Sequence, residues 1–551
     1  MLNISSFAAI GGFLFGYDVG VLSGCLLMED FQNRFINDQI SKTLLVSVLM
    51  AGAFVGALYS GPLADYIGRK RSIIIGTAVN ILGSVIQTAA TDTSMMIVGR
   101  VIGGLSIGQL SMLVPLYQSE IAPKELRGRL ITMQQFAITV GIAVSFWIDY
   151  GTINWEGSSS WRFPMGIRLI PAFILLFGMI FMPYSPRWLM AKGRDLEALK
   201  TIAFLRGNGS LSDQTVQMVF TEIKQSVVFE QKYTSQTYWE IFRSGHEHNR
   251  RRIWLGIAVQ IFQQLTGINV AVYYAADIFQ SAGVSGTTAA LFANGVDGMV
   301  NVIATIPTIF FIDKWGRRPT LISGAISCSA CMLILAIVLA THGLTDGTTN
   351  DIPIQEGTGS LSLLFTRNST VVVMVFLYLF VACYAYSWGP VGWIYPAELY
   401  PQRLRAKALG ITTAANWLFN FAISQLAPPM LSGIHWGTYL VFSIFCGLMA
   451  LMVYLEFPET KGKSLEEIDL IFSGQLKDDD LGVHHPATAA AALAQLERMK
   501  FSEKYSNRET SFGNAIEGAL KRVADEGAVN NEELELTPLK NNVPSPSPST
   551  T

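Results

Sequence analysis

The chain is poor in charge. Only 15% of its 551 residues are Asp, Glu, Lys or Arg, whereas soluble domains carry about 25%. Half of the residues are hydrophobic and the mean hydropathy is +0.37. A formal net charge of −2 offers no basic surface for a nucleic acid. This composition argues against a soluble domain and indicates a chain that crosses the lipid bilayer.

Cysteine is also scarce, and familiar catalytic patterns are missing. All five cysteines fall in apolar segments and are expected to be small buried hydrophobic residues. Cys328 and Cys331 have CxxC spacing, but inside an apolar span we expect them to pack rather than to bind metal or cycle redox state. The sequence lacks a nucleophile–base pair, a metal-ligand cluster and a phosphate-binding loop. We therefore expect no enzymatic activity, no cofactor and no metal.

Twelve apolar stretches are long enough to cross a bilayer, which takes about 20 residues. They lie near 5–27, 43–63, 72–91, 95–118, 129–150, 162–183, 253–280, 289–312, 319–341, 370–394, 404–427 and 434–457. The sequence thus predicts an all-α membrane protein with twelve transmembrane helices in two six-helix bundles, 1–183 and 253–462. Residues 184–252 would form a cytoplasmic linker with short amphipathic helices. Residues 463–551 would form a cytoplasmic, largely disordered tail.

A pattern of charged residues occurs once in each half of the chain. Its members are Asp65, Arg69, Glu120 and Arg127 in the first half, and Asp313, Arg317, Glu398 and Arg405 in the second. A duplicated pattern on duplicated spans indicates two homologous bundles, which is typical of transporters with a site between the halves. Such charges can form ion-pair networks that hold in one conformation and break in another. The alternative is that these charges only determine the topology of the chain in the membrane.

Lysine and arginine gather in loops that all lie on one side if the spans alternate. By the positive-inside rule this side is cytoplasmic. Both termini and the linker would then be cytoplasmic as well, in a multi-pass protein of the plasma membrane.

Asp18 lies in the middle of the first predicted span. A carboxylate there costs about 3 kcal/mol on insertion scales and persists only with a partner or a water-filled cavity. Buried carboxylates can serve in proton exchange, so the functional hypothesis is proton coupling, and the alternative is a structural ion pair. Arg100, at the start of the fourth span, is a candidate partner. A pair that opens when Asp18 is protonated would be a two-state element.

Side-chain amides mark the seventh predicted span, where Gln263 and Asn269 fall roughly on one face with Tyr273. Amides both donate and accept hydrogen bonds, which suits a neutral, polyhydroxylated ligand. The alternative is hydrogen bonding between helices. Polar residues of other spans extend this set: Gln135, Asn301, Asn416 and Asn420.

The tenth predicted span is interrupted by Gly389 and Pro390. Proline removes a backbone hydrogen bond and glycine loosens the helix, so the segment is predicted to be a hinge or gate. A passive kink is the alternative. Trp393 follows, and its ring could stack on a sugar or anchor the helix at the membrane interface.

Several short motifs follow one another along the chain. They are Gly68-Arg69-Lys70, Pro183-Tyr184-Ser185-Pro186-Arg187-Trp188, Gln263-Gln264-Leu265-Thr266-Gly267-Ile268-Asn269, Gly316-Arg317-Arg318 and Pro458-Glu459-Thr460-Lys461-Gly462. On these motifs the chain resembles the sugar porter family of the major facilitator superfamily, over residues 5–465. Its general appearance is similar to fungal monosaccharide–proton symporters. The resemblance implies transport of a hexose such as glucose, or of a pentose, by alternating access.

The resemblance also implies roles for individual residues. A sugar site is implied at Gln135, Gln263, Gln264, Asn269, Asn301, Trp393 and Asn416. Tyr273 and Tyr274 match a pair thought to close the outward gate. Asp18 matches the carboxylate of proton-coupled members, where passive animal facilitators carry an asparagine. Bacterial symporters of this family carry a glutamate in the sixth span, and at the matching position this sequence has Arg168. It could pair with Asp18, hold it ionised and make uptake less responsive to pH near neutrality.

The sequence therefore predicts a monosaccharide transporter, coupled to a proton. A passive sugar facilitator is the first alternative, with Asp18 as a structural charge. A sugar sensor that signals through residues 463–551, with cytosolic partners for that tail, is the second. The expected partners are a sugar, a proton and the lipid bilayer, and no nucleic acid.

Overall fold

The structure is a computed structural model that describes residues 2–36, 39–206, 209–233, 238–242, 248–273, 286–342 and 367–463, with residues 468 and 472. The regular elements in these ranges are all helices. The chain divides into two units, Met1–Ala489 and Ala490–Thr551. Every helix below belongs to the first. Beyond residue 463, the predicted tail lies outside the described residues except for 468 and 472.

The first half of the chain forms one bundle of helices. They are α1 (Leu2–Ala8), α2 (Ile10–Cys25), α3 (Glu29–Phe35), α4 (Gln39–Ile67), α5 (Arg69–Ala89), α6 (Thr93–Ile121), η1 (Lys124–Leu126), α7 (Arg127–Thr152), α8 (Ser159–Ile167) and α9 (Leu169–Phe181). α2 packs on α7, and α6 packs on both α4 and α5. The α2–α7 approach requires glycine, because a Cβ at Gly16 would overlap the backbone of Ile138.

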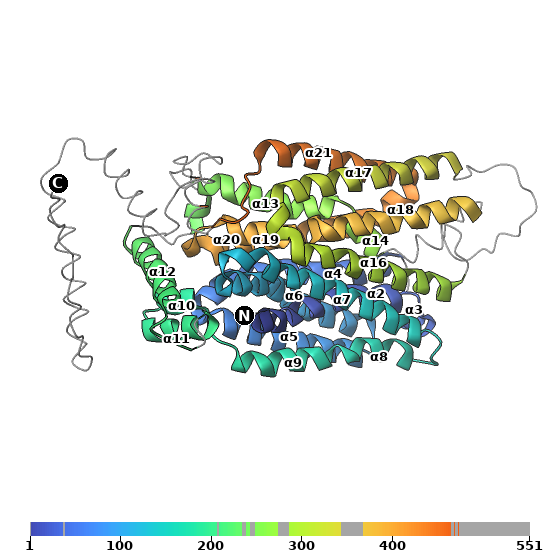
Figure 1. Ribbon diagram of the computed structural model, residues 1–551. Coiled ribbons are helices and arrows are strands. Elements are labelled where there is room, and N and C mark those ends of the chain that lie inside the picture. Colours follow the sequence, from blue (N-terminus) through green and yellow to red (C-terminus); the bar gives the residue numbers. More distant parts are fainter. Residues whose placement is uncertain are drawn as a thin grey trace, which may run out of the picture. The chain divides into compact units, whose positions relative to one another are not determined.

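The second half forms the other bundle. Its described helices are α13 (Asn249–Leu265), α14 (Ile268–Tyr273), α16 (Thr287–Trp315), α17 (Arg317–His342), α18 (Arg367–Tyr386), α19 (Trp388–Leu399), α20 (Gln402–Gly433) and α21 (Trp436–Glu456). α4 packs on α20 and α7 packs on α16, so these two helix pairs join the bundles. In Figure 1 the blue helices of the first bundle run alongside the yellow and orange helices of the second.

Short helices occupy the described part of the segment between the bundles. They are α10 (Pro186–Ala191), α11 (Asp195–Arg206), α12 (Gln214–Tyr233) and η2 (Tyr238–Phe242). α10, α11 and α12 share a hydrophobic cluster that includes Trp188, Ile202 and Val216 and is separate from the main core. The sequence predicted short amphipathic helices here.

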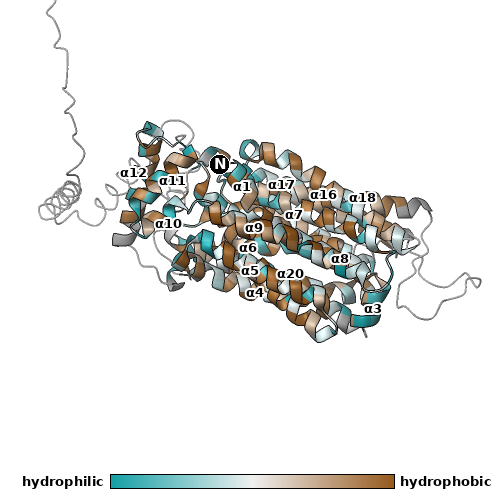
Figure 2. Ribbon diagram, turned by 90° about the horizontal axis from the view of Figure 1, so that it is seen from below, coloured by the Kyte–Doolittle hydropathy of each residue, from teal (hydrophilic) through white to brown (hydrophobic). Residues whose placement is uncertain are grey.

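Ten helical stretches of the described residues are long and apolar enough to cross a membrane. Figure 2 shows hydrophobic residues along the bundle helices and hydrophilic ones concentrated in α3 and α12. Two predicted spans, 253–280 and 404–427, are not among the ten, although α13, α14 and α20 occupy them. α13 and α14 are too short, at 17 and 6 residues, and residues 274–285 lie outside the described part of the chain. In α20 the side-chain amides of Asn416, Asn420 and Gln425 lower the hydropathy.

Four predicted spans consist of two helices in series. The breaks lie at Ala9, Arg168, Gly267 and Ser387. Gly267 has a φ of 88°, a conformation that favours glycine. In the tenth span the break precedes the predicted hinge, because Gly389 and Pro390 lie in the first turn of α19. Proline fits there, since the first helical N–H groups have no intrahelical acceptor.

Candidate functional site

The amides of α13 face the break between α18 and α19. The side-chain N–H group of Gln263 donates to the carbonyl oxygens of Trp388 and Gly389, at 3.0 and 3.2 Å. Gln263 is 3% exposed, so water could not satisfy these carbonyls as well. A polar side chain of one helix thus stabilises the interrupted backbone of another.

Gln260 makes the same kind of bond one turn earlier. Its side-chain N–H group donates to the carbonyl oxygen of Gly392 at 3.0 Å. Helical geometry assigns that oxygen to the N–H of residue 396, which is a proline and has none. Asn416 of α20 donates in turn to the side-chain oxygens of Gln260 and Gln263, at 2.6 and 2.8 Å. Gln260 was not predicted, although its spacing from the glutamine pair places it on the same face.

The predicted trio of the seventh span lies together. Asn269 donates to the side-chain oxygen of Gln264, and Gln264 donates to that of Gln263 at 3.3 Å. We call Gln260, Gln263, Gln264, Asn269 and Asn416 the amide cluster. In this conformation its members bind one another and the backbone, so the interhelical bonding weighed as an alternative is present.

Aromatic rings bring the first bundle into contact with this region. Phe15 of α2 lies 6.2 Å from Trp393 and 5.0 Å from Trp417, measured between ring centroids. The indole N–H of Trp417 donates to the hydroxyl oxygen of Ser111 on α6 at 3.1 Å. Phe15 and Trp417 were not predicted, because apolar rings in apolar spans carry no distinguishing signal.

Gln135 and Asn301 approach from α7 and α16, which pack against each other. A Cβ at Gly389 would lie 3.0 Å from the side-chain nitrogen of Gln135, so this glutamine of the first bundle rests on the broken helix of the second. Asn301 is 3% exposed, and its side-chain oxygen has no hydrogen-bond partner. The predicted site residues therefore come from both bundles.

The predicted gate lies on α14. Tyr273, its last residue, is buried and interacts with Asn420 of α20 and with Arg100 of α6. Tyr274 lies outside the described residues. α14 thus connects α20 of the second bundle with a cation of the first bundle.

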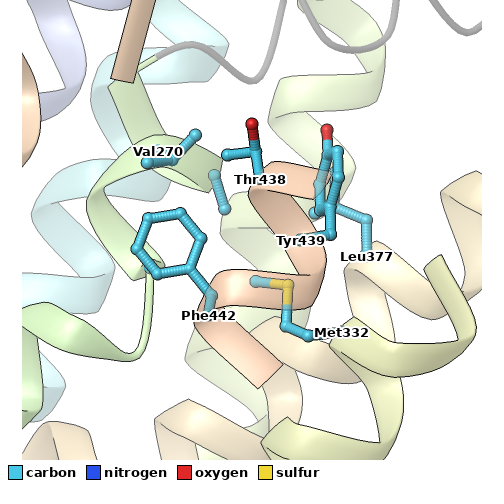
Figure 3. Close-up of a pocket in the computed structure, with 8 residues that line it drawn as sticks. Val270, Met332, Leu377, Thr438, Tyr439 and Phe442 are labelled. Atoms are coloured by element: carbon cyan, nitrogen blue, oxygen red, sulfur yellow. The ribbon is translucent and has the colours of Figure 1, made fainter. Parts of the chain in front are cut away.

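A small apolar cavity lies behind α14. Figure 3 shows Val270, Met332, Leu377, Thr438, Tyr439 and Phe442 around it. Its volume of about 10 Å³ holds at most one water molecule, whereas ligand pockets measure about 300–1,000 Å³. The cavity is therefore too small to hold a sugar.

Asp18 forms a buried ion pair with Arg168, and each side chain is 1% exposed. Arg168 lies at the break between α8 and α9, and both helices pack against α2. The prediction that Arg100 is the partner of Asp18 is wrong for this conformation. Arg100 interacts instead with Tyr273 and with Cys25, which lies about two turns further along α2.

The charged repeat of the first bundle is gathered at one end of the helices. Arg69 lies 2.9 Å from Glu120 and 3.3 Å from Asp65, measured between nitrogen and oxygen. Arg127 begins α7 at the same end and is 4% exposed. A single arginine thus joins the ends of α4, α5 and α6.

The second bundle repeats this arrangement. Arg317 lies 2.8 Å from Glu398 and 3.0 Å from Asp313. Arg405 donates to the carbonyl oxygen of Tyr400 at 2.9 Å. The equivalent residues of the two halves therefore form equivalent pairs.

Contact between the bundles at this end runs through Asp313. Its carboxylate accepts a hydrogen bond of 3.0 Å from the backbone N–H of Arg129, in the first turn of α7. A carboxylate at a helix N-terminus is also favoured by the helix dipole. Gly128 allows this approach, because a Cβ there would overlap Asp313 and Arg317. The bundles are thus in contact at the end that the sequence predicts to be cytoplasmic, which we call the closed end. A hydrogen bond of 2.6 Å from Gln425 of α20 to Ser47 of α4 also joins them toward the opposite end.

Two bundles of membrane-spanning helices, with broken helices and buried amides where they meet, define a membrane transporter of the major facilitator type. Residues 4–472 match the family model described as sugar (and other) transporter. The chain belongs to this family. The predicted fold class and the predicted family are both confirmed.

Individual relatives agree with this assignment. A high-affinity glucose transporter of Kluyveromyces lactis is 36% identical over 475 residues, covering 85% of this chain and 84% of that protein. The high glucose sensor of Saccharomyces cerevisiae is 36% identical over 485 residues, covering 85% of this chain and 60% of that protein. The proton:xylose symporter XylE, solved with 6-bromo-6-deoxy-D-glucose, is 28% identical with a TM-score of 0.72, covering 85% of this chain and 98% of that one.

Proposed function

We propose that the chain carries a monosaccharide across the plasma membrane by alternating access, together with a proton, and that glucose is its leading substrate. The amide cluster, which the second bundle builds from α13, α14 and α20, is the observation that carries this proposal. Its five side chains combine donors and acceptors without a net charge, which suits sugar hydroxyls. A glucose transporter and a sugar–proton symporter among the relatives support the same substrate class.

In this proposal the sugar lies between the amide cluster and the residues that face it from the first bundle. Gln135 and Asn301 add hydrogen-bonding groups, and Trp393 offers a ring face to the C–H side of the sugar. Tyr273 and Tyr274 close the outer side. The hinge at Gly389 and Pro390 lets α19 move as the site changes access.

The charged repeat would hold the closed cytoplasmic end. The bonds of Arg69 and Arg317 to their carboxylates, and the Arg129–Asp313 contact, support this role. Opening toward the cytoplasm would break the contact between the bundles and allow the pairs to rearrange. Both termini and α10–α12 are then cytoplasmic, and the chain needs no cofactor and performs no enzymatic step.

Proton coupling would involve the buried charges of the first bundle. Asp18 is held by Arg168 in this conformation, so it would take a proton only when that pair opens. An Asp18 that stays paired throughout would make the chain a passive facilitator. Arg100 is available as an alternative partner in another conformation.

The test is uptake of labelled glucose in yeast that lacks its own hexose transporters, with and without a protonophore. Symport predicts that the protonophore abolishes accumulation by the wild type, and that Asp18→Asn loses accumulation but keeps exchange. If neither the protonophore nor Asp18→Asn changes uptake, the protein is a passive facilitator. Competition by xylose and galactose would define the substrate range.

A sugar sensor is the second candidate, favoured by the similarity to the yeast glucose sensor. Deleting residues 463–551 separates the two. A transporter keeps its uptake without the tail, whereas a sensor that recruits cytosolic partners through the tail loses its signal.

A further inference from the structure

Asp149 is a second buried carboxylate of the first bundle, with no role in the mechanism above. It lies in the last turn of α7 and is 0% exposed, and neither carboxylate oxygen has a hydrogen-bond partner. It packs directly against Gly24 of α2, where any Cβ would overlap it. An ionised carboxylate in such surroundings is very costly. This conformation therefore suits the neutral, proton-bearing form.

Arg100 is the matching cation. It is 2% exposed, and two of its guanidinium nitrogens have no hydrogen-bond partner. Asp149 lies against Gly24 of α2, and Arg100 belongs to α6, which packs on both α2 and α7. Among the ion pairs of the described residues, one joins Asp18 to Arg168, and none includes Asp149 or Arg100.

We propose that Asp149 is a proton-binding site of the transport cycle and that Arg100 is its counter-charge once the proton has left. The proposal rests on the proton-coupled sugar transport proposed above. A proton from external water forms an O–H bond with one carboxylate oxygen of Asp149 and later returns to water on the cytoplasmic side. Loading breaks one O–H bond of an external hydronium ion, and release breaks the O–H bond of Asp149 as a cytoplasmic water molecule takes up the proton.

The position of Asp149 suits loading from outside. α7 begins at Arg127, at the closed end of the bundles, and Asp149 lies near the opposite end. Asp18 is deeper along α2 and already paired with Arg168. Asp149 is thus the carboxylate nearer the external water and the one not held by a cation.

Arg100 connects this proton site to the sugar gate. It interacts electrostatically with Tyr273 at the end of α14, and Tyr273 interacts with Asn420 of α20. An ionised Asp149 attracts Arg100. A protonated Asp149 carries no charge, so Arg100 then keeps its interaction with Tyr273. The protonation state of one carboxylate would therefore bias the helix that closes over the sugar.

Other groups on the helices around α7 fit this role less well. Besides Arg100, those toward the outer end are Tyr17, Asp18 and Cys25 of α2, Arg162 of α8, Arg168 between α8 and α9, and Asp297 of α16. The remaining ones, such as Glu120 and Glu398, lie at the closed end in ion pairs. A metal ion would need several oxygen ligands, and no acidic, histidine or cysteine group of the described residues could hold one.

Asp297 provides a matched control. It is 2% exposed, and one of its carboxylate oxygens has no hydrogen-bond partner, but it belongs to the second bundle and lies beside Tyr378. Asp297→Asn removes an equally buried carboxylate without touching Arg100.

The experiment uses the purified full chain in proteoliposomes. Glucose counterflow reports exchange, and a trapped pH dye reports proton movement when glucose is added. We expect the wild type and Asp297→Asn to move protons with glucose. We expect Asp149→Asn to exchange glucose, because exchange needs no net proton transfer, but to lose at least about 90% of the proton movement, a tenfold effect.

The outcomes separate this proposal from the one before it. A wild type that transports glucose without protons refutes symport, and the role of Asp149 with it. A wild type that moves protons, with Asp149→Asn moving them equally well, refutes only the role of Asp149. If Asp149→Asn does not reconstitute, Asp149→Glu is measured: a shifted pH profile of accumulation supports the proposal, and an unchanged one contradicts it.

Discussion

The ion pair between Asp18 and Arg168 can be tested by removing its partners singly and together. Both side chains are 1% exposed, so neither charge can turn to water when the other is lost. We expect Arg168→Gln and Asp18→Asn each to destabilise the protein by about 3–5 kcal/mol, because each leaves an uncompensated buried charge.

The double variant should be more stable than the sum of the single effects implies. Replacing both charges with amides leaves polar groups that can hydrogen-bond each other, so the penalty of the isolated charge disappears. We expect a coupling energy of about 2–3 kcal/mol, at the upper end for contacting residues. Arg168→Gln should also make uptake more sensitive to pH, because Asp18 can then respond by binding a proton.

The assay is chemical unfolding of the purified variants in detergent at neutral pH. Lys224→Gln serves as the control, since its pair with Asp195 is 2.9 Å long but 46% and 40% exposed, and such pairs contribute about 0–1 kcal/mol. If Arg168→Gln costs no more than this control, or if the single effects simply add, the buried pair does not exist as described.

Three further predictions concern other parts of the fold. Arg317→Gln removes the cation shared by two carboxylates at the closed end, so glucose uptake should fall while surface expression persists; unchanged uptake would rule out a role in closure. Gly267→Ala should destabilise the protein by about 1–2 kcal/mol, because φ is 88° and a Cβ would lie 2.9 Å from the ring of Phe442; a neutral effect in thermal unfolding would contradict this strain. The hydrogen bond from the Trp161 indole holds the pKa of Asp30 below its ordinary value of 3.8. The resulting stability is complete above pH 3.8 and is lost as the pH falls through the lower, folded-state pKa, so Trp161→Phe should flatten the acid limb of a Tm–pH profile.

Periodicity and hydropathy predicted most of the helices, because a bilayer imposes a length and an apolar composition on every span. They predicted the spans of α13 and α20 as well, but not the break at Gly267, before which α13 ends after 17 residues. The break at Arg168 was also invisible, since an arginine after an apolar run does not reveal that the helix is interrupted there.

The part of the candidate site that lies on a single predicted span could be predicted from the sequence. Gln263, Gln264 and Asn269 share a segment, and their spacing places them together. Which groups meet across helices depends on helix rotation, which spacing does not determine. For that reason Arg100 was named as the partner of Asp18. Asp149 was not among the predicted site residues, because a carboxylate in the last turn of a predicted span resembles an interfacial residue.

The most direct test of the account is glucose binding to the purified protein, followed by tryptophan fluorescence. Trp393 and Trp417 flank Phe15 beside the amide cluster, so a bound sugar should change their emission. The account predicts saturable binding by the wild type. Gln263→Ala removes an amide that would pair with a sugar hydroxyl, and a buried hydroxyl without a partner costs about 1–3 kcal/mol, so that variant should bind at least roughly tenfold more weakly. Equal affinity in both proteins, with Gln263→Ala still folded, would mean that the amide cluster does not bind the sugar.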